Sequence, residues 1–282
     1  MLQRAAPFLF VFLWSTGFLG AKLGLPHAAP LAFLFVRYLL VIALMTSIAL
    51  FLRAPWPRDG RQWLHIGVSG LLVHATYLGG VFIAIGKGLP AGITALVVGL
   101  QPLLTATLAG RLLGETVLPR QWLGLVLGFA GTGLVVSGKL GSGFGTAALL
   151  PAIVALLGIT LGTLYQKRFA PHFDWRSGAV AQFLPSALVT GAIVFVRDDF
   201  RIDWTGEFAF ALGWLVLVLS VGAISLLNWL IRHGSAVNVA SLFYLTPPTT
   251  ALLAWGLFGE TLGGIALAGM ALAVWGVYLS RR

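Results

Sequence analysis

The chain has 282 residues, of which 59% are hydrophobic and only 9% are charged, and it carries a formal net charge of +10. Soluble domains carry roughly 25% charged residues, so this composition excludes an ordinary soluble protein. The lysines and arginines lie mainly in short segments between apolar runs, which is typical of membrane topology and argues against a nucleic-acid-binding role.

Ten apolar runs follow one another along the chain, and each is long enough, at about 20 residues, to cross a bilayer as a helix. The first run lies behind Arg4 as a signal peptide would, but nine similar runs follow it, and we interpret it as a retained span. We therefore predict an all-α integral membrane protein with ten transmembrane helices. The predicted spans are 6–25, 30–52, 63–86, 90–113, 119–138, 146–169, 176–197, 208–231, 235–258 and 262–280.

The positive charges also predict an orientation. If the N-terminus lies inside, twelve of the eighteen lysines and arginines fall at inner ends of spans, five fall at outer ends, and Arg37 lies within the second span. An excess of positive charge on the cytoplasmic side is the rule for such proteins. We therefore predict a multi-pass protein with both termini in the cytoplasm.

The first and sixth predicted spans end in the same way. In each, a lysine near the end of the span is followed by a proline and a histidine, at positions 145 residues apart in the chain. Each lysine could extend toward lipid headgroups, as lysine commonly does near helix ends, or could act in a gate by docking on carbonyls or an acid. The two sets are Lys22, Pro26 and His27, and Lys167, Pro171 and His172.

The same shift of 145 residues aligns the rest of the chain with itself without a gap. Residues 91–116 and 236–261 are identical at twelve of 26 positions, among them Pro102 with Pro247. Each repeat holds five spans, an odd number, so the second must be inserted upside down relative to the first. Inverted repeats around a site near the midplane are the architecture of secondary transporters, which open alternately to each side. The predicted domains are 1–137 and 146–282.

Four features of the sequence point to a known family. They are "WSTGFLGAKLGLP" at 14–26, Arg37 early in the second span, the proline-containing fourth and ninth spans, and the two "GET" sequences at 114–116 and 259–261. Together they resemble the EamA family of the drug/metabolite transporter superfamily, and the resemblance covers essentially the full length. It implies two inverted five-helix repeats and, most commonly, export of amino acids or related metabolites across a bacterial inner membrane. These motifs mark the family well and the substrate poorly.

Arg37 is the most informative single charge, because it lies about seven residues, or roughly 10 Å, into the second span. An arginine inside the membrane usually faces a cavity or a partner. It could bind a substrate carboxylate through two parallel hydrogen bonds. The alternative is a structural arginine that bonds backbone carbonyls, because the position 145 residues later is the neutral Gln182.

His74 is predicted near the midplane of the third span. Histidine titrates near physiological pH unless burial changes its pKa, so it could relay protons, or it could be a packed, neutral side chain. The proline-containing spans are expected to bend at Pro102 and Pro247, where freed carbonyls need partners. Glu115 and Glu260, in the two "GET" sequences, are expected at the N-terminus of the span that follows each.

Further polar and aromatic residues lie at comparable depth in the spans. Such side chains commonly hold helices together, and they could equally line an uncharged cavity. With Arg37 and His74, the predicted substrate-binding residues are Trp14, Thr16, Tyr77, Gln101, Thr163, Tyr165, Asn238 and Tyr244, and the predicted gating or structural residues are Lys22, Lys167, Pro102 and Pro247.

No aspartate or glutamate falls in the interior of any predicted span. Antiport of lipophilic cations through a membrane-embedded glutamate is therefore disfavoured. We expect no metal and no other cofactor, because no cysteine, acid or second histidine stands at ligand spacing. An intramembrane enzyme or a passive channel would need a catalytic constellation, rings of charge or a carbonyl filter, and the sequence shows none of these.

The sequence thus predicts a secondary transporter, not an enzyme, that exports small metabolites from the bacterial inner membrane, with neutral or hydrophobic amino acids as the leading class. The alternatives are a carrier for anionic or nucleotide-like metabolites, using Arg37 and Lys22, and a broader drug or metabolite efflux carrier. The expected partners are a small-molecule substrate and membrane lipids, without nucleic acid. Ten helices complete one carrier, so we expect a functional monomer, although a homodimer is possible because the glycine-rich fifth and tenth spans could pair.

Overall fold

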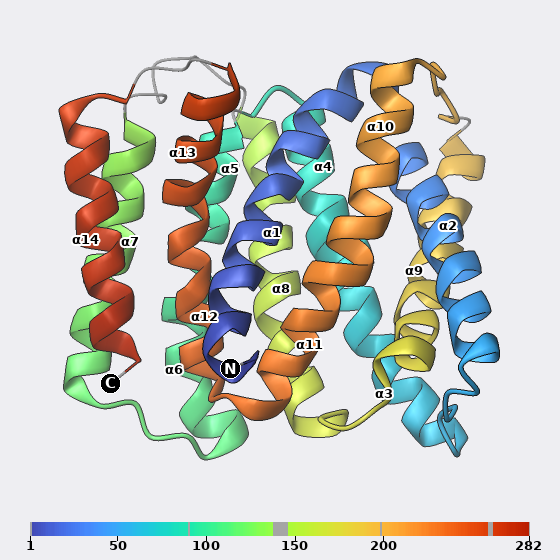
Figure 1. Cartoon of the computed structure of the whole chain (residues 1–282), viewed down its shortest axis with the longest axis horizontal. Helices are drawn as coiled ribbons and strands as arrows, with labels where there is room; N and C mark the ends of the chain where they lie inside the picture. The colour runs from blue at the N-terminus through green and yellow to red at the C-terminus, as the bar shows by residue number, and fades with distance from the viewer. Residues whose placement is uncertain (1, 90, 138–145, 198, 259–261, 282) are drawn as a thin grey trace.

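The computed structural model describes residues 2–89, 91–137, 146–197, 199–258 and 262–281. Across these residues the chain is almost entirely helical, and an isolated β-bridge joins Ala28 to Ile202. The helices form ten consecutive passes through one bundle (Figure 1). This architecture confirms the predicted all-α fold.

The first repeat contains five passes, of which the third and the fourth are divided into shorter segments. The first, second and fifth passes are α1 (Leu2–Gly24), α2 (Pro30–Phe51) and α7 (Pro119–Ser137). The third pass consists of α3 (Gly60–Gly70), η2 (Leu71–Leu78) and α4 (Gly79–Gly86). The fourth pass consists of α5 (Ala91–Val98) and α6 (Gln101–Leu113). A short 3-10 turn, η1 (Leu25–His27), links α1 to α2.

The second repeat starts with a 3-10 turn, η3 (Thr146–Ala148), and divides its passes at the corresponding places. The sixth, seventh and tenth passes are α8 (Leu149–Phe169), α9 (Trp175–Arg197) and α14 (Gly264–Ser280). The eighth pass consists of α10 (Gly206–Trp214), η4 (Leu215–Ala223) and α11 (Ile224–His233). The ninth pass consists of α12 (Ala236–Ser241), η5 (Leu242–Leu245) and α13 (Thr246–Phe258).

Successive passes run in opposite directions, so both termini lie at the same end of the bundle (Figure 1). We call it the terminal end and the other the opposite end. Helix α1 leaves the terminal end, whereas its counterpart α8 runs toward it, which makes the two repeats inverted. Among the described residues, six helical segments are long and apolar enough to cross a membrane, and Ala5–Gly17 and Gly264–Ser280 are shorter apolar helices.

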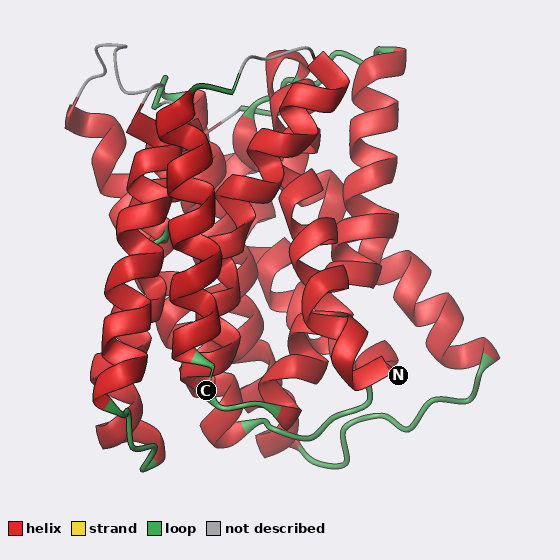
Figure 2. Cartoon of the chain, turned by 60° about the vertical axis from the view of Figure 1, so that its left-hand side comes forward, coloured by secondary structure: helices red, strands yellow, loops and turns green. Residues whose placement is uncertain are grey.

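The repeats interlock through contacts that the inversion relates. Helix α1 packs against η4 just as α8 packs against η2, and α2 packs along α9. Helices α7 and α14 form a tight pair at one side of the bundle, the side that Figure 2 brings forward. A Cβ atom on Gly131 would lie 2.4 Å from the backbone nitrogen of Ala273, so this approach requires glycine. The glycine-rich fifth and tenth passes therefore pair within one chain.

π-helical turns interrupt the third and eighth passes at corresponding positions, η2 and η4. In each, a hydroxyl donates to the carbonyl five residues earlier: Thr76 to Leu71 and Ser220 to Leu215, both at 3.1 Å. π-helical turns are rare and frequently lie at functional sites. Here they face the centre of the bundle, where α1 and α8 pack against them.

Candidate substrate site

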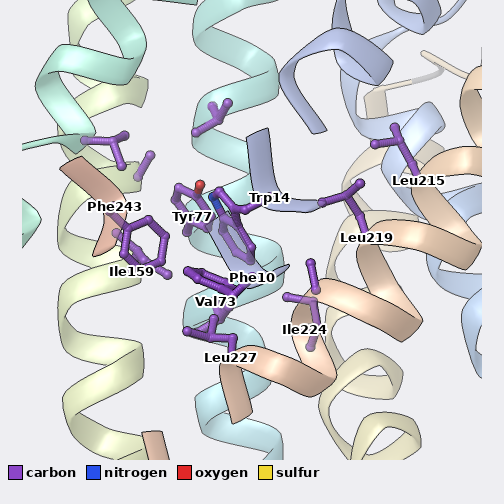
Figure 3. Close-up of a cluster of buried hydrophobic side chains, with 14 of the residues drawn as sticks. Phe10, Trp14, Val73, Tyr77, Ile159, Leu215, Leu219, Ile224, Leu227 and Phe243 are labelled. Carbon is purple, nitrogen blue, oxygen red and sulfur yellow. The ribbon is translucent and has the colours of Figure 1, made fainter. Parts of the chain in front are cut away.

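A cavity lies between α1, α2 and the third and eighth passes, and its lining includes Trp14, Arg37, Tyr77, Leu215 and Leu219. We call it the central cavity, and Figure 3 shows several of its apolar lining side chains, among them Trp14, Tyr77 and Leu219. Its volume is about 40 Å³, which exceeds the roughly 10–15 Å³ that one water needs. It is well below the roughly 300–1,000 Å³ of typical ligand pockets. A metabolite therefore needs a wider state of this cavity.

Arg37 is the charged side chain in this lining, and it is only 3% exposed. Its Nε atom donates to Ser220 Oγ at 3.0 Å, which ties α2 to the π-helical turn η4. The ion pairs found among the described residues do not include Arg37. A buried guanidinium without a carboxylate partner is costly, and the geometry of its remaining N–H groups suits a carboxylate.

Aromatic side chains from α1, η2 and η5 cluster at the cavity (Figure 3). The rings of Trp14 and Tyr77 lie parallel, with their centroids 6.2 Å apart and an interplanar angle of 9°. One turn closer to the terminal end, Phe10 packs against Trp14 at 5.2 Å, and Phe243 contacts both of them at 5.3–5.4 Å. The cavity therefore offers one cation and an otherwise largely apolar wall, which fits a small amphiphilic molecule.

His74 lies just outside this lining and is fully buried. Its ring stacks on Phe183 with the centroids 3.9 Å apart, and its backbone carbonyl accepts a hydrogen bond from the Tyr38 hydroxyl at 2.8 Å. Neither ring nitrogen has a hydrogen-bond partner among the described residues. The stacking on Phe183 fits the alternative of a packed, neutral histidine. The two ring nitrogens without partners are the groups that a proton relay would use.

A second polar group lies at the position that the inversion relates to the central cavity. We call it the amide cluster; it consists of Gln166, Gln182, Asn228 and Ser69, from α8, α9, α11 and α3. The three amides form a closed ring of hydrogen bonds at 3.0–3.2 Å, and Gln182 also donates to Ser69 Oγ at 3.2 Å. Gln182 corresponds to Arg37, and Gln166 corresponds to Ala21 of the cavity lining. Gln166 and Asn228 are not among the residues predicted from the sequence.

The terminal end carries a third polar group, which we call the latch: Glu115, Lys167, Gly234 and Ala236. Both carboxylate oxygens of Glu115 accept from the backbone N–H of Ala236 at 3.0 Å, and Lys167 Nζ lies 3.3 Å from Glu115 Oε1. Lys167 also donates to the carbonyl of Gly234. The latch thus joins the loop after the fourth pass to the end of the sixth and the start of the ninth.

This geometry corrects the expectation for Glu115. Gly114 does end α6, in the left-handed conformation with φ +70° that suits glycine. Glu115, however, binds the first N–H of α12 and not the start of the following helix α7. A carboxylate at a helix N-terminus is favourable in either place, so the local sequence could not decide between them. Glu260 and the side chain of Lys22 lie outside the described part of the structure.

The other predicted residues divide between the central cavity and other places. Trp14, Arg37 and Tyr77 line it together, whereas Gln101, Thr163 and Lys167 border a separate pocket of about 10 Å³ near the latch. Beside the cavity, Thr16 Oγ1 accepts a hydrogen bond from Trp214 Nε1 at 3.0 Å. Tyr165 does not line the cavity; its hydroxyl is hydrogen-bonded to His65 Nδ1, with 2.7 Å between the two atoms. The ring of Tyr244 faces Gly128 of α7.

Several of these side chains keep a buried polar atom without a partner among the described residues. They are Gln101 Oε1, Asn238 Oδ1 and the Tyr244 hydroxyl. Pro102 and Pro247 both lie in the first turn of a helix that follows a break in its pass, where proline is tolerated. Among the described residues, no group of three or more His, Cys, Asp or Glu side chains could hold a metal ion.

Comparisons with known proteins place the chain in a family. The EamA-like transporter family matches residues 5–137 and 146–282. The inner membrane transporter YedA of Escherichia coli (strain K12) is 28% identical over 97% of this chain and 89% of its own length. A probable amino-acid metabolite efflux pump of Salmonella typhimurium is 27% identical over 96% of this chain and 92% of its own length.

The fold also has a counterpart among solved structures. One crystal structure superposes with a TM-score of 0.78 at 23% identity, covering 97% of this chain and 94% of the other. The two sequence relatives above are named as a transporter and as an efflux pump. The described helices are those of a multi-pass membrane protein. The chain belongs to the EamA-like transporter family, within the drug/metabolite transporter superfamily.

Proposed function

We propose that this protein exports small amphiphilic metabolites, with neutral or hydrophobic amino acids as the leading class, by alternating access around the central cavity. The observation that carries the proposal is Arg37, a buried cation in a largely apolar lining that is not among the ion pairs of the described residues. An amino acid supplies the carboxylate that such a guanidinium lacks, and an apolar side chain suits the aromatic wall.

Substrate binding follows from these groups. The carboxylate accepts from the guanidinium N–H groups of Arg37 while Nε stays bound to Ser220, and water leaves the apolar wall as the side chain enters. Binding at Arg37 therefore acts on α2 and on the π-helical turn η4 at once. The unpartnered oxygens of Gln101 and Asn238 are candidates for the substrate ammonium in a wider state.

The amide cluster and the latch act as closures of the terminal end. They connect the third, fourth, sixth, seventh, eighth and ninth passes by hydrogen bonds and one ion pair. Opening toward the terminal end requires these contacts to break, and closing the opposite end requires the central cavity to collapse around Arg37. Each state then exposes the substrate to one side only.

Direction and coupling follow from charge and composition. The distribution of lysine and arginine predicts that the terminal end faces the cytoplasm, and a relative named as an efflux pump supports export. No aspartate or glutamate lies within a predicted span, so we propose facilitated transport. His74 remains the candidate for proton coupling, because its ring nitrogens are unpartnered among the described residues.

Counterflow in proteoliposomes tests the proposal, with labelled leucine, an anionic metabolite and a lipophilic cation, each with and without a pH gradient. We expect leucine flux that needs no gradient. Arg37→Gln, which copies the second repeat, should reduce it more than tenfold, because losing one partner of a buried charge pair costs about 2–5 kcal/mol. Arg37→Lys should retain part of the flux, and the exposed Arg53→Gln should retain all of it.

The same panel separates the alternatives. Flux of the anion without leucine would favour a carrier for anionic metabolites. Flux of the cation, with Arg37→Gln unchanged, would favour a broader efflux carrier. Leucine flux that needs a proton gradient and is lost in His74→Gln would replace facilitated transport with proton coupling. Silence for every compound, in vesicles where another carrier is active, would contradict the transport proposal.

A further inference from the structure

A groove on the outside of the bundle is a second concave feature, distinct from the central cavity. It has a volume of about 670 Å³ and lies where residues of α1, η5, α13 and α14 meet. We call it the lateral groove. In Figure 1, α13 lies between α1 and α14 on the near side of the bundle. Its volume falls within the roughly 300–1,000 Å³ range of small-molecule sites.

The lining of the lateral groove is apolar and open to the surroundings of the bundle. Phe8 on α1 is 70% exposed, Leu252 on α13 is 47% exposed, and Val274 on α14 is 56% exposed. Apolar residues on the outer face of a membrane protein contact lipid tails. The described residues of the lining include no acid, so a zwitterionic amino acid would leave its ammonium unpaired among them.

One end of the groove carries a positive charge. Arg281 follows the last residue of α14 and borders the groove at the terminal end, beside Tyr278. The ion pairs among the described residues do not include Arg281, and partial burial lowers the pKa of its guanidinium. An anion at this position would offset that loss of hydration.

The groove therefore has the layout of an amphiphile with a negative head. Phe8 and Phe12 lie in the first half of α1. Val274 and Tyr278 lie in the last two turns of α14, and Arg281 follows them, so the groove runs from the terminal end into the apolar part of the bundle. We propose that the lateral groove binds an anionic phospholipid from the leaflet at the terminal end, with its headgroup on Arg281 and an acyl chain along α13. The bilayer supplies this ligand at high local concentration.

Native mass spectrometry of the detergent-solubilised protein tests the site, by titration with phosphatidylglycerol and, separately, phosphatidylcholine of the same acyl chains. We expect tighter retention of the first phosphatidylglycerol. Arg281→Gln should weaken it about fivefold, because one basic residue near a membrane contributes about 1 kcal/mol to binding of anionic lipid. Arg111→Gln removes an exposed arginine at the same end, outside the groove, and should leave retention unchanged.

A second pair of variants tests the acyl-chain part of the site. Val274→Trp fills the groove and should reduce retention of both lipids, whereas Leu267→Trp, at a site of similar exposure on the same helix but outside the groove, should not. Equal retention of the two lipids by the wild type, or equal losses in Arg281→Gln and Arg111→Gln, would overturn the proposal. So would a change of oligomeric state in Val274→Trp with lipid retention unchanged, because the groove would then be a contact between copies of the chain.

Discussion

The two repeats share a fold but differ at the positions that the inversion relates. In the first repeat, Arg37 and Ala21 border a cavity, whereas in the second, Gln182 and Gln166 fill the corresponding space with hydrogen-bonded amides. The central cavity lies between the first and second helices of the first repeat and η4 of the second repeat. The amide cluster lies between the first and second helices of the second repeat, α11 and α3. In a transporter with inverted repeats, one half is closed while the other is open, and this difference in side chains adds a chemical asymmetry to that arrangement.

The difference also divides the chemistry of the protein. The first repeat places a charge, Arg37, in the lining of the central cavity, and the second repeat places neutral amides that satisfy one another. Buried polar groups are stable when every member has a partner. This contrast is why we propose the amide cluster as a closure and the central cavity as the substrate-binding site.

The most severe test of this comparison makes the first repeat resemble the second. Ala21→Gln introduces the side chain of Gln166 into the central cavity, whose volume is about 40 Å³. The longer side chain should occupy the space beside Arg37 and block binding, so we expect counterflow of the substrate to fall below one tenth of the wild-type rate. Ala21→Ser, which adds one atom, is the control. Full activity of Ala21→Gln would show that the substrate does not use this cavity.

The reverse exchange should have a moderate effect on stability. Gln166→Ala gives the second repeat the residue of the first. It removes the donor to Asn228 Oδ1 and one of the two acceptors of Gln182 Nε2, which keeps its hydrogen bond to Ser69. A buried polar group that loses its partner costs about 1–3 kcal/mol. We expect a lower thermal transition in detergent. Thr163→Ala should change it less, because the Thr163 hydroxyl donates to carbonyls of its own helix. An unchanged transition would mean that water replaces the lost amide at no cost.

The smallest expected effect concerns the start of α9. Asp174 accepts from the backbone N–H of Arg176 at 2.9 Å and forms an ion pair with its side chain at 2.7 Å, whereas the corresponding residue before α2 is Ala29. The hydrogen bond and charge of Arg176 lower the pKa of Asp174. Because this pKa is depressed in the folded protein, the stabilisation is complete above the unfolded value, about 4, and is lost as the pH falls through the folded value.

Asp174→Ala should therefore cost about 1 kcal/mol or less at pH 7, because the pair is partly exposed. The cost should vanish at a pH below both pKa values of the carboxyl group. Thermal unfolding of the variant and the wild type across this pH range checks the prediction. A cost that stays constant with pH would show that the carboxylate charge does not contribute.

The sequence predicted the framework better than the contacts within it. Ten spans, their alternation and the shift of 145 residues follow from apolar runs and from pairs such as Lys22 with Lys167, which are local features. The partner of Glu115 could not be predicted, because it lies 121 residues away, at Ala236. The π-helical turns and the amide cluster also depend on how distant helices pack together. One signal for the amide cluster was present in the sequence, because the polar Gln166 stands where the first repeat has the apolar Ala21.

Cysteine accessibility in Glu115→Gln tests alternating access most directly, because the chain has no native cysteine. Ala21→Cys reports on the central cavity and Thr163→Cys on the pocket beside the latch. Loss of the Glu115 charge weakens the ion pair with Lys167 and the interaction with the N-terminus of α12 by about 1 kcal/mol. The account predicts that labelling of Thr163→Cys by a water-soluble maleimide rises about fivefold while labelling of Ala21→Cys falls, with Asp59→Asn at the same end as the control. Labelling that rises at both positions, or changes at neither, would contradict the account.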